Sequence, residues 1–134
     1  MQALRGVSAA EARWVPARRR HNIWELVLHI AYWDYAVRRR LDPESPRDFP
    51  RSPANWPSLP QQPDERAWAR DRSLLKREPD ALVRVVRRVK TSRWNRHLTG
   101  RWTCGETIVG IAAHEVYHTG QIQLLKRLWS GRAR

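Results

Sequence analysis

At 134 residues the chain is long enough to bury a core without disulfide staples and short enough to form one domain. A formal net charge of +13 indicates a strongly basic surface, but the cations are almost all arginines spread over the whole chain, so the charge alone does not identify a nucleic-acid partner. The single cysteine, Cys104, excludes an internal disulfide, and the chain shows neither a signal-peptide core nor an apolar run of roughly 20 residues, so we expect a soluble cytoplasmic protein with no membrane partner.

Residues 1–21 lack apolar periodicity and are predicted to form a connecting segment with one short helix at 9–14. The first long helix is predicted over 23–41. Asn22 and Glu25 form a capping-box pattern at its start, and Pro43 follows its end. Its apolar positions recur at helical spacing, namely Ile23, Leu26, Ile30, Trp33 and Val37.

The segment 42–63 carries a proline every three or four residues, which regular helices do not accommodate. We therefore predict a long crossover loop. Loops of this length in a compact domain are usually packed or functional. For this reason we expect Trp56 and Leu59 to pack against the helices.

A second long helix is predicted from Asp64 to about Lys90, with a kink or a break caused by Pro79. Residues 93–102 are predicted to form a loop, and no segment of the chain shows a strand pattern.

The last helix is predicted to begin at the capping box of Thr103 and Glu106 and to extend to Gly131. Together these elements predict an all-α fold. Cys104 lies in the first turn of this helix, and we interpret it as a small packing residue.

Three histidines are predicted to point into the core. His114 and His118 lie four residues apart on the last helix, so their imidazoles project from the same side, in a stripe with Ile111 and Leu125. His29 shares a stripe with apolar residues of the first long helix. A single inward histidine is usually a hydrogen-bonded core residue, whereas three together match the ligand count of an open zinc-type site.

We therefore predict that His29, His114 and His118 bind one divalent ion, Zn²⁺ or Ni²⁺, because imidazole suits both. Four further side chains are predicted to line the site or to orient its imidazoles, namely Glu25, Trp33, Tyr117 and Gln121. The capping box alone also explains Glu25. The sequence assigns no catalytic residue.

The segment from His114 to His118 also fits H-E-x-x-H, the zinc-protease pattern in which the glutamate is the general base. Such proteases take a third ligand downstream of the motif. No His, Asp, Glu or Cys follows His118 in the sequence, which disfavours a protease.

Two segments carry a resemblance to a known family. The stretch HNIWELVLHIA at 21–31, together with AHEVYHTGQI at 113–122, resembles the DinB-like (YfiT-like) superfamily. The resemblance implies an up-down-down-up four-helix bundle whose metal site takes one histidine from the second helix and an H-x-x-x-H pair from the last. These ligands correspond to His29, His114 and His118.

Relatives in this superfamily include thiol transferases that use bacillithiol or mycothiol, a mycothiol-dependent maleylpyruvate isomerase, and proteins described only as metal-dependent hydrolases. The resemblance thus implies metal-assisted group transfer from a small thiol. Two alternatives remain open, a metal-dependent hydrolase and a non-enzymatic basic stress or DNA-associated protein whose metal is structural. For both the thiol transferase and the hydrolase, the expected partner is a small-molecule substrate.

The chain departs from the family at its N-terminus, where almost none of the usual first helix precedes the stretch ALRGV at 3–7. We therefore expect a DinB-like domain over 1–134 that is truncated relative to the family. An incomplete bundle exposes apolar helix faces, so we also expect a homo-oligomer.

Overall fold

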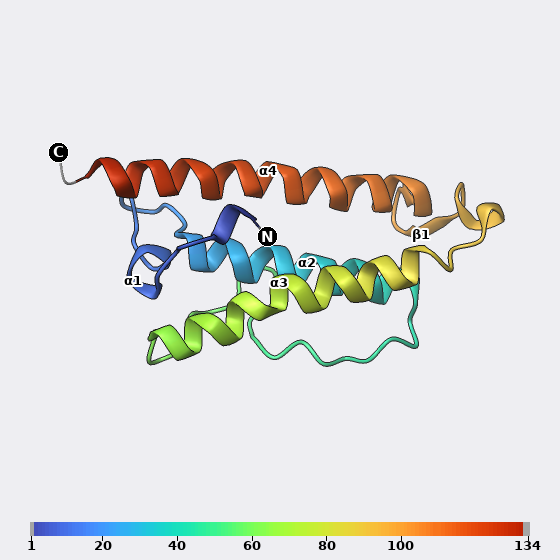
Figure 1. Ribbon diagram of the computed structural model, residues 1–134. Helices are drawn as coiled ribbons and strands as arrows, with labels where there is room; N and C mark the ends of the chain where they lie inside the picture. The colour runs from blue at the N-terminus through green and yellow to red at the C-terminus, as the bar shows by residue number, and fades with distance from the viewer. Residues whose placement is uncertain (1, 133–134) are drawn as a thin grey trace.

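The computed structural model describes residues 2–132 and is dominated by three long helices (Figure 1). The fold is all-α, as the sequence predicts. In chain order its elements are a 3₁₀ turn at Gln2–Leu4, α1 (Ala9–Ala12), α2 (Ile23–Leu41), α3 (Glu65–Val86), a 3₁₀ turn at Thr91–Arg93, β1 (His97–Thr99), β2 (Trp102–Thr103) and α4 (Cys104–Gly131).

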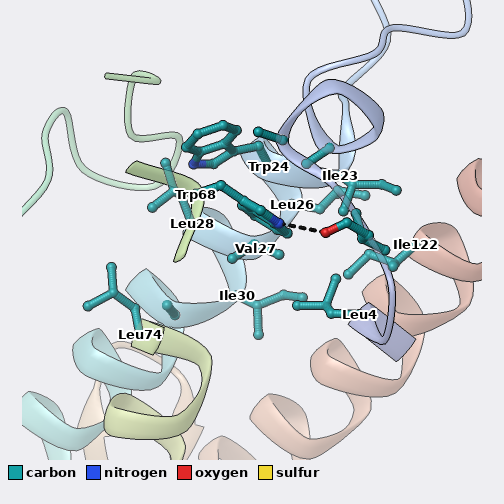
Figure 2. Packing of buried hydrophobic residues seen from close by; sticks show 14 of the residues in the cluster. Leu4, Ile23, Trp24, Leu26, Val27, Leu28, Ile30, Trp68, Leu74 and Ile122 are labelled. Atoms are coloured by element: carbon teal, nitrogen blue, oxygen red, sulfur yellow. Dashed lines mark hydrogen bonds between the residues drawn. The ribbon is translucent and has the colours of Figure 1, made fainter. Parts of the chain in front are cut away.

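Helix α2 is the centre of the bundle, because both α3 and α4 pack against it (Figure 1). Nearly every residue in the first turns of α2 is buried, and most of these residues are apolar. Trp24 and Trp68 of α3 pack with ring centroids 5.1 Å apart in this core (Figure 2). The Nε1 of Trp68 donates a hydrogen bond to the carbonyl of Val7 at 2.9 Å, which attaches the N-terminal segment to the helices.

Capping boxes define the starts of α2 and α4, as predicted. Asn22 accepts from the backbone N–H of Glu25, and the Glu25 carboxylate accepts from the backbone N–H of Asn22. Thr103 and Glu106 form the same reciprocal pair at α4. Each box pairs two of the N–H groups that a helix start leaves without partners.

The crossover loop between α2 and α3 is irregular and runs alongside α3 (Figure 1). Trp56 and Leu59 are partly buried against the main core, which confirms their predicted packing. Arg51 of the loop pairs with the buried Asp71 of α3 at 2.7 Å, and the other carboxylate oxygen of Asp71 accepts from Trp24 Nε1 at 2.9 Å. The loop is therefore fixed to the bundle on both sides of its middle.

One local prediction was wrong and another was narrowed. Helix α3 is continuous through Pro79, so of the predicted kink or break the break does not occur. The segment predicted as a loop over 93–102 instead contains β1 and the first residue of β2, which form a short antiparallel pair, although no strand was predicted. These strands have three and two residues and turn at Gly100, whose φ is +64°, so they are too short to carry an alternating pattern.

Within residues 2–132, none of the helices is both long and apolar enough to cross a membrane.

Candidate metal centre

Three histidines from two helices converge at one point between α2 and α4. One ring nitrogen from each of His29, His114 and His118 lies within 4.8 Å of the other two. His29 and His118 are buried and His114 is half-buried. The four-residue spacing on α4 and the central position of α2 bring them together. Within residues 2–132, no carboxylate or thiol belongs to this group.

The distance between two of these nitrogens suits ligands of a common ion. The Nε2 atoms of His114 and His29 are 3.1 Å apart. Two imidazoles bound to one tetrahedral ion at about 2.0–2.1 Å would hold their nitrogens at about 3.3 Å. The rings therefore stand close to a ligating arrangement.

A backbone carbonyl fixes the tautomer of His29. Its Nδ1 lies 2.6 Å from the carbonyl oxygen of Asn55 in the crossover loop. A carbonyl only accepts, so Nδ1 carries the proton and Nε2 presents its lone pair to the cluster. Asn55 has a φ of +70°, a left-handed conformation that asparagine adopts more readily than most residues.

A side-chain amide orients His118 in the same way. Nδ1 of His118 lies 2.6 Å from Oε1 of Gln121, and Nε2 of Gln121 donates to the Tyr117 hydroxyl at 3.1 Å. The proton on Nδ1 leaves Nε2 of His118 as the free ligand atom. Partners of this kind orient metal-binding imidazoles in known sites.

His114 differs, because its Nδ1 is buried and has no hydrogen-bond partner among the described residues. Nδ1 therefore lacks a partner both when Nε2–H of His114 donates to His29 and when Nε2 faces an ion, so it does not distinguish the two states. With the proton of His114 on Nδ1, all three Nε2 lone pairs face one point. The residues present therefore fit a divalent ion.

The surroundings of His114 and His29 favour the neutral imidazoles, which can bind a metal ion. Burial lowers the pKa of His114 to about 4, and the neighbouring His118 and His29 act in the same direction. Burial also lowers the pKa of His29, although the Asn55 carbonyl opposes this shift. Both imidazoles are thus neutral at pH 7, which is the form that binds metal.

Aromatic rings of the loop and of α2 cover the cluster. Trp56 stacks on His29 at 3.8 Å between centroids, and His21 stacks on the other side of Trp56 at 3.7 Å. Trp33 packs edge-on against His29 and His114 at 6.4 and 6.1 Å, and its Nε1 donates to Oδ1 of Asn55. These contacts restrict both the ring positions and the access of water.

The four predicted neighbours have different roles. Trp33, Gln121 and Tyr117 contact the cluster directly or through one hydrogen bond. Glu25 completes the α2 capping box and pairs with His21 at 3.1 Å, so its link to the cluster runs through His21 and Trp56. The sequence did not point to Asn55, because the group that contacts His29 is its backbone carbonyl, which any residue carries.

Glu115, the glutamate of the H-E-x-x-H match, does not belong to the three-histidine group. It lines a cavity with Gln2, Ile30, Leu75 and Gln123, and none of the three histidines lines that cavity. It also raises the pKa of the buried Asp34, a secondary cause after burial. This position gives no support to Glu115 as a general base at the histidines.

A family model described as the DinB superfamily matches residues 1–122, which include all three histidines. The chain belongs to the DinB superfamily. Comparisons with curated proteins and with solved structures gave no match. The DinB assignment supports the metal-binding interpretation of the cluster, and residues 2–132 supply three long helices of the bundle.

Proposed function

We propose that this DinB protein is a metal-dependent enzyme that transfers a low-molecular-weight thiol of the bacillithiol or mycothiol type to an electrophilic carbon. The observation that carries the proposal is the pair of Nε2 atoms 3.1 Å apart, with the His29 and His118 tautomers fixed by Asn55 and Gln121. The ion is Zn²⁺ or Ni²⁺, one per chain, held by His29, His114 and His118.

A divalent ion bound there would act as a Lewis acid and lower the pKa of a coordinated thiol. The chain's own residues orient the imidazoles and shield the cluster from water. Asn55 and Gln121 hold two imidazoles with their lone pairs inward, and Trp56 and Trp33 shield the cluster. The transfer joins the thiol sulfur to carbon, breaks the bond from that carbon to its leaving group, and releases the thiol proton.

Metal analysis and histidine substitution test the site. We expect one Zn²⁺ or Ni²⁺ per chain in protein purified without an affinity tag, measured by elemental analysis. His29→Ala, His114→Ala and His118→Ala should each lose most of the ion, since each removes one of three ligands. His97→Ala is the matched control, because His97 is exposed on β1 and lies outside the cluster. Full occupancy in all three ligand variants would refute the site.

Activity assays separate the three functional alternatives. Metal-loaded protein should conjugate bacillithiol or mycothiol to an alkylating electrophile, and chelation should abolish this reversibly while circular dichroism stays helical. Glu115→Gln should keep the activity, because Glu115 lies outside the three-histidine group and lines a cavity that none of these histidines reaches. Ester or amide hydrolysis without thiol transfer would favour the hydrolase. Loss of helicity on chelation, with neither activity in the restored protein, would favour a structural metal.

A further inference from the structure

A cavity of about 230 Å³ lies beside the histidine cluster, between α2 and the first turns of α4. His114 forms part of its wall, whereas His29 and His118 do not line it. The rest of the wall is mainly apolar and includes Trp33, Val37, Trp102 and Ile111. A molecule bound in this cavity therefore sits directly against one of the proposed metal ligands.

The size and lining of the cavity suit one ring. An enclosed apolar cavity of about 150 Å³ holds benzene. A space of about 230 Å³ accommodates a ring with a short substituent. The indoles of Trp33 and Trp102 line the cavity, with Arg40 over the Trp33 ring and Arg101 over the Trp102 ring, so a bound ring meets their edges or the faces that these cations leave free. Trp102 is 52% exposed, so the entrance of the cavity is apolar and open to solvent.

One cation stands in the same wall. The guanidinium of Arg40 lies over the Trp33 ring at 5.4 Å from its centroid. Among residues 2–132, no carboxylate lies within ion-pair distance of Arg40. The carboxylate in the wall, Glu106, accepts from the N–H and the hydroxyl of Thr103 in the α4 capping box. Arg40 therefore keeps its donors for a ligand.

We propose that this cavity is the substrate site of the metal centre and that it selects a small aromatic carboxylate. The ring lies against Trp33 and Trp102, and the carboxylate pairs with Arg40, whose planar donors match two carboxylate oxygens. That the bound molecule is a substrate rests on the proposed function, whereas its binding in the cavity can be measured without any reaction.

Binding of two matched probes to the metal-loaded protein tests the selection. Phenylacetate and phenylacetamide have nearly the same shape, and only phenylacetate carries a charge. By isothermal titration or ligand-observed NMR we expect phenylacetate to bind about two- to fivefold more tightly, because its carboxylate forms a charge-assisted pair with Arg40, which is exposed and therefore partly screened. Arg40→Gln should remove the difference and leave phenylacetamide binding unchanged, and Trp102→Ala should weaken both probes.

Arg127→Gln is the matched control, because Arg127 is exposed on α4 and does not line the cavity. Equal affinities in the wild type would overturn the proposal. A preference for phenylacetate that survives Arg40→Gln would also overturn it, since the carboxylate would then bind elsewhere, including at the ion. Failure of thiol transfer with the charge preference intact would refute the proposed function alone.

Discussion

Asp34 of α2 is a carboxyl group that the fold buries completely, near Glu115 of α4 and Glu78 of α3. Neither carboxyl oxygen accepts a hydrogen bond from an N–H or hydroxyl group of the described residues, and the Glu115 carboxyl lies close enough to share a proton with Asp34. Burial raises the pKa of Asp34 to about 9, and the nearby Glu115 and Glu78 act in the same direction. At pH 7 the folded protein therefore keeps a proton on Asp34 that the unfolded chain has released.

This proton predicts that stability falls as pH rises. Between the unfolded pKa of Asp34, near 4, and its folded value of about 9, folding takes up one proton, so the free energy of unfolding decreases with pH. Asp34→Asn removes the titration and should stabilise the protein by about 1–3 kcal/mol at pH 8. Thermal unfolding from pH 5 to 9 should show a gain that grows with pH. A gain of equal size at pH 5 and pH 8 would contradict this.

The candidate ligands are the part of the site that the sequence predicted. His114 and His118 are visible because the H-x-x-x-H spacing places two imidazoles on one helix face, and His29 because it interrupts an apolar stripe. The loop groups that orient His29 were not predicted as part of the site. The Asn55 carbonyl and the Trp56 stack depend on the path of an irregular segment, which has no periodicity to read.

At the scale of elements, the predictions succeeded where a local interaction sets a boundary. The capping boxes at Asn22 and Thr103 define helix starts from four residues each, so α2 and α4 were predicted almost to the residue. The hairpin of β1 and β2 was missed because its pairing depends on a turn at Gly100 and on the position of α4, not on strand propensity.

The junction between this hairpin and α4 depends on Gly105. Its backbone N–H donates to the Trp94 carbonyl at 2.9 Å, and a Cβ at Gly105 would lie 2.4 Å from Nε1 of Trp94. Gly105→Ala must displace the indole and should destabilise the protein by about 1–2 kcal/mol. Circular dichroism should show a melting temperature lower by roughly 3–8 °C.

Gly110→Ala provides the control for this prediction. A Cβ at Gly110 meets no heavy atom within 4 Å, and alanine in a helix interior is favoured over glycine by about 0.5–1 kcal/mol. The two substitutions on the same helix should therefore shift the melting temperature in opposite directions. A stabilising Gly105→Ala would show that Trp94 moves aside without loss.

At the scale of the whole molecule, the middle of α4 is nearly uncharged although the chain is strongly basic. Between Glu106 and Lys126 the helix carries one formally charged side chain, Glu115, in a chain of net charge +13. Its outward face presents Val109, Val116 and Leu124 at 62%, 75% and 57% exposure. An uncharged apolar stripe on such a surface is typical of a covered interface. We infer that a second copy covers it, because a two-fold pairing sets this uncharged stripe against itself.

This inference predicts a homodimer whose stability increases with salt. Screening weakens the repulsion between two chains of charge +13, while apolar burial is retained, so sedimentation at micromolar concentration should show more dimer at 0.5 M than at 0.05 M NaCl. Val116→Glu combined with Leu124→Glu should give a monomer, because burying two carboxylates at the two-fold interface is unfavourable. Val83→Glu, at an exposed valine of α3, should leave the dimer intact. A monomer at both salt concentrations, or equal disruption by Val83→Glu, would exclude pairing through α4.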